Sequence, residues 1–453
     1  MNQAATASAV PATSSSAATR IRKLTTLPLI AATFFMVSGG PFGLEELIGN
    51  AGYALSVIVL LIVPLIWSLP TALMVSELSE AIPRDGGYYV WVMRGLGPFW
   101  GFQEAWLSLF ASIFDMALYP TVFVLYASRI WPALQTETAG LVAGAGMILL
   151  CTVWNLRGAR IVGNSAVLLG IVLMVPFLFM AAKVFVSPAT WHATSAAGSG
   201  TLLTGLLVAM WNFMGWDNAS TIAAEVENPQ KTYGRAMLSS ALLVAIAYLI
   251  PVAACWRAGI SSEGWTTGAW AIAAQQIAGK WAFLGVVVGG IIFGIGMFNS
   301  LALSYTRVPY AMAEDGWLPS MFKKLNRFGV PWVSVIACAI GWALALTLGF
   351  VKLIELDVAI YGLSLILEFA ALIALRIKEP KLPRPFRVPG GVMGCVVASV
   401  GPTLLIVLAV IESVHQTTTI WGWTFNNLAV ATTVVVLGPL QYWIAVRSTR
   451  PSA

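Results

Sequence analysis

The stretch Ser38-Gly39-Gly40-Pro41-Phe42-Gly43 interrupts the first long apolar segment of the chain, residues 25–49. Three glycines and a proline within six residues cannot sustain an α-helix, because glycine costs backbone entropy and proline removes a hydrogen-bond donor. A second apolar segment, residues 202–224, is interrupted by Trp211-Asn212-Phe213-Met214-Gly215-Trp216-Asp217-Asn218. These interruptions decide the fold that we predict, an all-α integral membrane protein in which helices 1 and 6 are broken.

The composition indicates that lipid surrounds most of the chain. Of its 453 residues, 58% are hydrophobic and only 10% are charged, whereas soluble domains carry about 25% charged residues. A helix that crosses about 30 Å of hydrocarbon needs roughly 20 apolar residues. We therefore predict twelve membrane-spanning helices, at residues 25–49, 54–80, 97–127, 138–156, 161–186, 202–224, 236–258, 282–312, 331–350, 353–376, 393–413 and 424–446.

The distribution of Lys and Arg predicts the orientation. Alternate loops, starting with the N-terminal segment, hold 20 of the 25 basic residues, and the remaining loops hold five. Basic residues accumulate in loops on the cytoplasmic side. We therefore expect a plasma (inner) membrane protein with cytoplasmic tails at 1–24, which is disordered, and at 447–453. Because this rule explains the surplus of positive charge, no nucleic-acid partner is expected.

The two interruptions also predict a binding site. Unwound backbone in a membrane is tolerated only where it lines a cavity or is covered by protein, and paired broken helices mark the substrate site of inverted-repeat transporters. The alternative is that both are kinks that serve only helix packing. The predicted substrate-binding residues are Ser38, Gly39, Gly40, Pro41, Phe42, Gly43, Asp115, Trp211, Asn212, Phe213, Gly215, Trp216 and Asp217.

Three acidic residues, Asp115, Asp217 and Glu368, lie inside apolar segments. An ionised carboxylate at mid-membrane costs about 3 kcal/mol, and no Lys or Arg lies deep in these segments. Each acid is expected to face a water-filled cavity, bind a cation or take up a proton. The alternative is a protonated carboxyl group hydrogen-bonded between helices. The candidates for proton coupling or for binding a substrate cation are Glu45, Asp217, Glu225 and Glu368.

Residues beside the breaks bear on the charge of the substrate. Glu45 and Glu46 directly follow the first break, where negative charge caps a helix N-terminus. A carboxylate at that position would also compete with the carboxylate of an amino acid, which favours an amine without an acid group. Aromatic side chains could cover an ammonium group through cation–π contacts, although packing is the alternative for each; they are Phe42, Phe114, Tyr119, Trp211, Phe213 and Trp216.

Several stretches resemble motifs of the amino acid–polyamine–organocation (APC) superfamily, and the similarity covers residues 25–446. ELSEAIPRDGGY (77–88) is similar to its loop after the second helix, EVENPQKT (225–232) to the segment after the sixth, and AMAEDGWLP (311–319) to the segment that closes the eighth. VSGGPFGLEELIG, FDMALYP and LILEFAALIALRIKEPKLPRPFRVPGG are similar to the plant-type polyamine-uptake branch, which is related to L-type amino acid transporters. Residues 211–217 are also similar to the sixth-helix site of bacterial arginine/agmatine antiporters.

The resemblance implies a LeuT-type fold with two inverted five-helix repeats, 25–186 and 202–376, followed by two extra helices at 393–446. It also implies alternating access around a site at mid-membrane. The fifth segment lacks the lysine that some proton-coupled members use in place of a sodium ion, which leaves the coupling ion open. The predicted outer loop between the third and fourth segments has no cysteine, so we do not expect the disulfide-linked heavy chain of animal L-type members.

We therefore predict a secondary active transporter that imports a polyamine or related cationic amine, coupled to H⁺. The alternative is an amino acid permease or exchanger for cationic or neutral amino acids. An enzyme, a cofactor or a metal is not expected, because the sequence has no metal-ligand spacing, nucleophile–base pair or phosphate-binding loop. A channel would show a repeated pore-lining filter, and nothing in the sequence suggests one.

Overall fold

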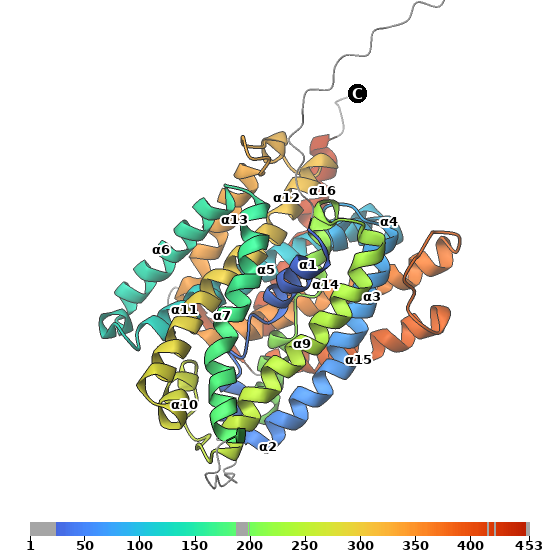
Figure 1. The fold of residues 1–453 in the computed structure, drawn as a ribbon. Coiled ribbons are helices and arrows are strands. Elements are labelled where there is room, and N and C mark those ends of the chain that lie inside the picture. Colours follow the sequence, from blue (N-terminus) through green and yellow to red (C-terminus); the bar gives the residue numbers. More distant parts are fainter. Residues whose placement is uncertain (1–23, 187–197, 199, 415, 421–422, 450–453) are drawn as a thin grey trace, which may run out of the picture.

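The computed structural model describes residues 24–186, 198, 200–414, 416–420 and 423–449, so the predicted tail at 1–24 lies almost wholly outside the described residues. The described chain is almost entirely helical (Figure 1). Within it, nine helical segments are long and apolar enough to cross a membrane. They are α2 to α3 (Glu45–Ala81), α5 (Pro98–Ala127), α6 (Glu137–Asn155), α7 (Ala159–Val186), α9 (Pro229–Arg257), α11 to α12 (Lys280–Glu314), α14 (Phe350–Lys378), α15 (Gly391–Ser413) and α16 (Asn427–Thr449).

The nine long segments correspond to all the predicted spans except the first, sixth and ninth. Those three contain shorter helices, α1 (Thr26–Val37), α8 (Leu202–Asn212) and α13 (Trp332–Leu344). The first long segment consists of α2 (Glu45–Val63), the π-helical turn η1 (Pro64–Ser68) and α3 (Leu69–Ala81). Gly52 has non-helical backbone angles within α2, which agrees with the predicted gap between residues 49 and 54.

Helix α9 begins at Pro229, seven residues before the predicted boundary. Proline is favoured in the first turn of a helix, because its missing N–H would have no helical partner there. The first two turns carry the exposed residues Lys231 and Arg235. Because these turns are polar, the apolar segment read from the sequence begins after them, although their backbone is helical. At the other end of the chain, α16 continues to Thr449, three residues into the predicted C-terminal tail.

Both predicted breaks are present. Helix α1 ends at Val37 and α2 starts at Glu45, and Gly39, Gly40 and Gly43 between them have positive φ angles that a side chain would disfavour. Helix α8 ends at Asn212, and Gly215 also has a positive φ. The chain then continues as a 3₁₀-helix, η3 (Asp217–Glu225), rather than as an α-helix.

The 3₁₀ geometry of η3 follows from its composition. Its sequence DNASTIAAE begins with Asp, Asn, Ser and Thr, whose side chains compete with helical hydrogen bonds. The Thr221 hydroxyl, for example, donates to the Asn218 carbonyl at 2.9 Å.

Several short elements were not predicted, because each is too short to span a membrane. Helix α4 (Gly87–Leu96) fills the connection between α3 and α5, and α10 (Ala269–Ala278) precedes α11 (Lys280–Tyr305). Strands β1 (Thr417–Ile420) and β2 (Trp423–Asn426) form an antiparallel hairpin before α16. The hairpin is rich in Thr, Ile, Trp and Phe, which favour strands.

Helices α5 and α14 form the centre of the bundle, where Figure 1 shows them surrounded by the other helices. In the most apolar 18-residue stretch of each of these two helices, 67% is buried inside the protein. The corresponding share is 17% in α16 and 28% in α6 and α15. Large apolar side chains such as Leu149 on α6 and Val397 on α15 are exposed on the outside. An apolar exterior of this kind suits a protein whose surroundings are hydrocarbon.

Helix α11 packs closely against α5 because of a glycine. A Cβ atom added at Gly290 of α11 would overlap the ring of Tyr126 on α5, and the Tyr126 hydroxyl donates to Glu45 at the start of α2. The close approach of α11 therefore also positions the end of the first break.

We predict that Gly290→Ala destabilises the protein by about 1–3 kcal/mol, the usual cost of overpacking a core. The measurement is the apparent melting temperature of the purified protein in detergent. Gly146→Ala on α6 is the matched control, because a Cβ there meets nothing within 4 Å and alanine favours a helix over glycine by about 1 kcal/mol. Equal melting temperatures for the two variants would contradict the close packing of α11 on α5.

Candidate functional site

A cavity lies where the two breaks meet α5, α11 and α14. Its volume is about 10 Å³. That is room for roughly one water molecule, so a larger ligand requires its walls to move apart. The lining residues are Met36, Val37, Ser38, Asp115, Tyr119, Trp211, Asn212, Met214, Gly215, Asn218, Met297, Tyr305 and Tyr361.

Asp115 on α5 is the acidic residue that lines this cavity. Its Oδ1 accepts hydrogen bonds from the Tyr119 hydroxyl at 2.8 Å and from the Trp211 indole N–H at 3.2 Å. Its Oδ2 accepts one from the Tyr305 hydroxyl at 3.0 Å. All three donors are neutral, and no basic residue is among the described residues that line the cavity. The carboxyl group is therefore held firmly in place with no positive charge against it.

Asp217 does not line the cavity, but it is hydrogen-bonded to Tyr361, which does. The Tyr361 hydroxyl donates to Asp217 Oδ1 and accepts a hydrogen bond from the backbone N–H of Gly215 at 3.3 Å. Tyr361 and Gly215 line the cavity, whereas Asp217 does not. The tyrosine thus connects the second break, the acid of η3 and the central helix α14.

Tyr305 on α11 connects the first acid with η3. It donates to Asp115, and the Asn218 side-chain amide contacts the Tyr305 oxygen at 3.5 Å. Asn218 in turn accepts a hydrogen bond from the Ser304 hydroxyl at 2.8 Å. The polar side of the cavity is therefore one connected network from α5 through α11 to η3.

Side chains, most of them from other helices, satisfy several backbone groups that the breaks leave free. The carbonyl of Asn212 accepts from the Tyr248 hydroxyl at 2.6 Å, and that of Phe213 accepts from the indoles of Trp67 and Trp216 at 3.0 and 2.8 Å. In the first break, the Pro41 carbonyl accepts from the Trp270 indole at 2.8 Å. Unpaired peptide groups are costly in an apolar surrounding, so these donors stabilise the non-helical backbone of the two breaks.

Glu45 caps the start of α2. Its carboxylate accepts hydrogen bonds from the backbone N–H groups of Gly43 at 2.6 Å and Gly268 at 2.9 Å, and from the Tyr126 hydroxyl. The neighbouring Glu46 accepts from the backbone N–H of Thr267 at 3.0 Å. The two acids therefore fix α2 to the turn before α10, and the positive end of α2 is occupied by the protein's own carboxylate.

The predicted substrate-binding residues divide into two groups. Five line the cavity: Ser38, Asp115, Trp211, Asn212 and Gly215. The others lie at the breaks but are not among its lining residues: Gly39, Gly40, Pro41, Phe42, Gly43, Phe213, Trp216 and Asp217. Phe42, for example, packs edge-to-face on Tyr126 and Phe177. Of the proton-coupling candidates, Glu45 and Glu368 also lie away from the lining, and the side chain of Glu225 is outside the described residues.

Much of the cavity lining was not predicted from the sequence. Tyr305 and Tyr361 come from helices with no break and no unusual motif, so that no local signal identifies them. Met36, Val37, Met214 and Met297 look like ordinary apolar residues of membrane helices. Asn218 lies within the second break, and its position directly after Asp217 is the one signal that could have identified it. Among the described residues, no group of three or more His, Cys, Asp or Glu is arranged to hold a metal ion.

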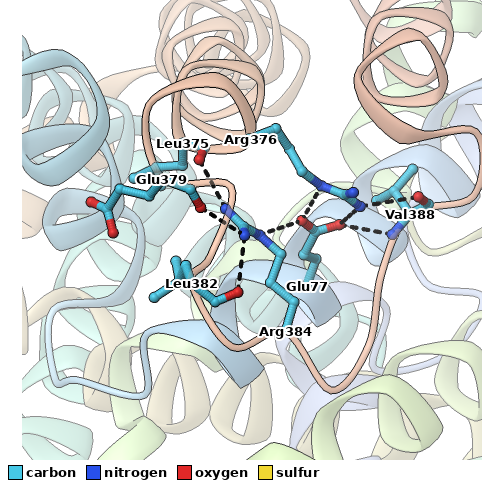
Figure 2. Close-up of polar contacts among 7 residues, drawn as sticks. All are labelled: Glu77, Leu375, Arg376, Glu379, Leu382, Arg384 and Val388. Atoms are coloured by element: carbon cyan, nitrogen blue, oxygen red, sulfur yellow. Dashed lines mark hydrogen bonds and ion pairs between the residues drawn. The ribbon is translucent and has the colours of Figure 1, made fainter.

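A second charged feature lies at the end of α14, away from the cavity (Figure 2). Glu77 of α3 is fully buried and accepts two hydrogen bonds of 2.5 Å from the guanidinium of Arg376. Arg384 lies 3.1 Å from the same carboxylate, and the backbone N–H of Val388 donates to it at 2.7 Å. This cluster, Glu77 with Arg376, Arg384 and Val388, ties α3 to α14 and to the connection that leads into α15.

The rim of the cluster includes an exposed ion pair. Arg94 of α4 donates to Glu379 at 2.9 and 2.6 Å, and this contact lowers the pKa of the Glu379 carboxyl. Arg384 is more deeply placed, and burial lowers the pKa of its guanidinium. Arg384 also donates to the carbonyls of Leu375, Glu379 and Leu382, so that it fixes the turn after α14 as well as the ion pair.

Comparisons with known proteins agree with the transporter-like geometry. Residues 30–436 match the family model described as amino acid permease. The chain is 36% identical to the polyamine transporter RMV1 of Arabidopsis thaliana over 85% of its own length and 80% of that protein. It is 37% identical to the polyamine transporter PUT1 of Oryza sativa subsp. japonica, over 85% of this chain and 73% of that protein. More distantly, it is 26% identical to the serine/threonine exchanger SteT of Bacillus subtilis, over 72% of this chain and 76% of that protein.

We predict that Glu77→Gln strongly destabilises the protein. Removing one partner of a buried ion pair leaves a charge without compensation, which costs about 3–5 kcal/mol. Glu379→Gln is the control, because its pair with Arg94 is partly exposed and such pairs contribute about 0–1 kcal/mol. The measurement is the apparent melting temperature in detergent, and equal decreases in the two variants would contradict a structural role that is specific to Glu77.

Proposed function

The chain belongs to the amino acid permease family and is a membrane transporter, and from this premise we propose that it carries a polyamine or related cationic amine. The observation that carries the proposal is the charge of the cavity. A carboxylate held by three neutral donors faces a space that has aromatic walls and no basic residue among its described lining. An ammonium group complements such a site through a charge-assisted hydrogen bond and cation–π contacts.

The position of Glu45 supports an amine without an acid group. A substrate carboxylate would be expected at the positive N-terminal end of α2. There the Gly43 N–H already donates to Glu45 at 2.6 Å. A second carboxylate at the same position would meet like charge and would find that donor occupied.

The cavity walls suit a flexible chain of methylene groups between ammonium groups. Met36, Met214 and Met297 line it, and methionine side chains adapt to irregular shapes because they are unbranched and have three rotatable bonds. These thioethers would move aside as a diamine enters the narrow cavity. One ammonium would bind Asp115, and the second would lie toward Tyr361 and Asp217.

For the architecture, we propose the LeuT-type arrangement with twelve spans, in which 25–186 and 202–376 form inverted repeats and 393–446 adds two helices. The breaks at 38–43 and 212–218 then occupy corresponding positions in the two repeats. Alternating access around the cavity follows from rocking of the helices that contain the breaks. Both termini lie on the cytoplasmic side of the plasma (inner) membrane by the distribution of Lys and Arg.

We further propose that transport is coupled to protons. Asp217 lacks a basic partner among the described residues and is joined to the cavity through Tyr361. A buried acid in this position is a suitable proton acceptor, and Glu225 at the end of η3 remains a candidate for a gate. Glu45 acts as a helix cap in this scheme rather than as a proton carrier.

We predict that Asp115→Asn impairs transport of diamines without unfolding the protein. Hydrogen bonds to charged groups contribute about 1.5–3 kcal/mol, so the apparent affinity should fall roughly ten- to a hundredfold. The measurements are uptake of labelled putrescine into proteoliposomes and thermal stabilisation of the purified protein by putrescine, spermidine, arginine and leucine. Asp315→Asn, at an exposed residue that accepts from Tyr89, is the matched control.

Two outcomes would overturn the proposal. One is stabilisation of the wild-type protein by leucine or arginine and not by either polyamine, which would favour the amino acid permease or exchanger. The other is unchanged putrescine affinity in Asp115→Asn, which would remove Asp115 from the substrate site.

A further inference from the structure

Two buried carboxyl groups lie outside the cavity lining, on the two central helices of the bundle. Glu104 is on α5 and Glu368 on α14, and both side chains are fully buried. Neither lines the cavity. An ionised carboxylate in the membrane interior is costly, so the presence of two requires an explanation beyond helix packing.

The two acids lie at equal distances along their helices from two other acids, Asp115 and Asp357. Glu104 lies eleven residues before Asp115 on α5, and Glu368 lies eleven residues after Asp357 on α14. Eleven residues make about three turns, roughly 16 Å, and return to the same helix face. Asp357 interacts electrostatically with Asp115, and Glu368 with Glu104. Helices α5 and α14 therefore run antiparallel, with Asp115 and Asp357 at one level of the bundle and Glu104 and Glu368 at a second level nearer the Glu77 cluster.

The oxygens of the second pair are largely without partners. Neither oxygen of Glu368 has a hydrogen bond within the described part of the chain, and the same holds for Oε2 of Glu104 and the hydroxyl of Tyr88. The remaining oxygen of Glu104 accepts from the Ser108 hydroxyl at 2.7 Å. Buried polar atoms normally have partners, so these four atoms mark a place where something else binds.

The groups that surround the pair supply no positive charge. Asp217 of η3 interacts electrostatically with both carboxyls. Tyr88 of α4 and Tyr361 of α14 lie close enough to interact with Glu368, and Cys338 of α13 interacts with Tyr88. Among the described residues, neither carboxyl has an ion pair or an electrostatic interaction with Lys, Arg or His.

A proton fits this site better than any larger cation. Two interacting carboxyl groups without a counter-ion repel each other when both are ionised, and this repulsion favours the uptake of a proton by the pair. An ammonium group or a metal ion would need space among tightly buried oxygens, whereas a proton needs none. The acid hydrogen would also give one of these unpartnered oxygens a hydrogen to donate.

We propose that Glu104 and Glu368 form the proton-binding pair of the transport cycle, separate from the amine site and joined to it by Asp217 and Tyr361. The inference rests on the proposed amine transport, which supplies the second cation. The pair gains one O–H bond when a proton arrives from water on one side, and that bond breaks when the proton leaves to the other side. No other bond changes. Asp217 interacts electrostatically with Glu104 and Glu368 and with Asp115, so that a proton on the pair affects the binding of the amine.

The test is transport by wild type, Glu368→Gln and Glu104→Gln in proteoliposomes. Labelled putrescine is offered in counterflow without a pH gradient, and then against a gradient of one pH unit imposed in either direction. For one proton per substrate, wild type should accumulate putrescine about tenfold in one of the two directions, because one pH unit corresponds to a tenfold ratio. A pH-sensitive dye inside the vesicles should report proton movement when putrescine is added.

We expect each glutamine variant to retain counterflow within about twofold of wild type, since the amine site is unchanged, and to lose both accumulation and proton movement. The control is Glu137→Gln on α6, an exposed residue, which should behave as wild type. Accumulation by Glu368→Gln equal to wild type would overturn the inference. Equal loss of counterflow and accumulation would overturn it as well, because the pair would then belong to the amine site or to the fold.

A failure of the proposed amine transport would give other results than a failure of the proton-binding pair. If thermal stabilisation shows that wild type binds arginine or leucine and no polyamine, the substrate proposal fails, and the same assays with the bound amino acid still test the pair. If wild type binds putrescine but shows neither accumulation nor proton movement, the amine site stands and the proton-binding pair is overturned.

Discussion

The structure depends on one constraint, that peptide groups released by a broken helix must find partners where water is scarce. At the second break, Tyr248, Trp67 and Trp216 donate to the carbonyls of Asn212 and Phe213. At the first, Trp270 donates to Pro41 and Glu45 accepts from Gly43. These long side chains come from several parts of the chain, so that each break is kept open by the fold as a whole. A cavity in the middle of the bundle is the consequence.

The buried acids differ in their hydrogen-bond and ion-pair partners. Glu77 has two arginines and belongs to the framework, whereas Glu45 has two backbone N–H groups and a tyrosine and caps a helix. Asp115 has three neutral donors and faces the cavity, which leaves it available for a cation. Glu368 has no hydrogen-bond partner within the described residues. Composition treats these residues alike, but their surroundings differ. Glu77 and Glu45 are tied to the fold by their partners, whereas we propose cation binding for Asp115 and proton binding for Glu368.

Helix α14 connects these groups mechanically. It carries Tyr361 at the cavity, Glu368 beyond it and Arg376 in the Glu77 cluster. From Tyr361 to Arg376 is about 22 Å along a continuous helix. A displacement of Tyr361 as an amine enters would therefore be transmitted to the far end of the helix, where α3 and the turn before α15 are attached. The proposed binding of substrate and the rearrangement of the bundle thus share one rigid element.

The sequence alone determined the membrane class, most helix boundaries and both breaks, because apolar length and glycine–proline content act locally and need no partner. It also identified Asp115 and Trp211, since an acid in an apolar segment and a polar break are visible without coordinates. Only the tertiary structure decided which backbone groups donate to Glu45, that Tyr305 and Tyr361 line the cavity, and that Glu104 interacts electrostatically with Glu368. Those assignments depend on which residues of distant helices come into contact, and the packing of helices against one another, which no local pattern encodes, determines that.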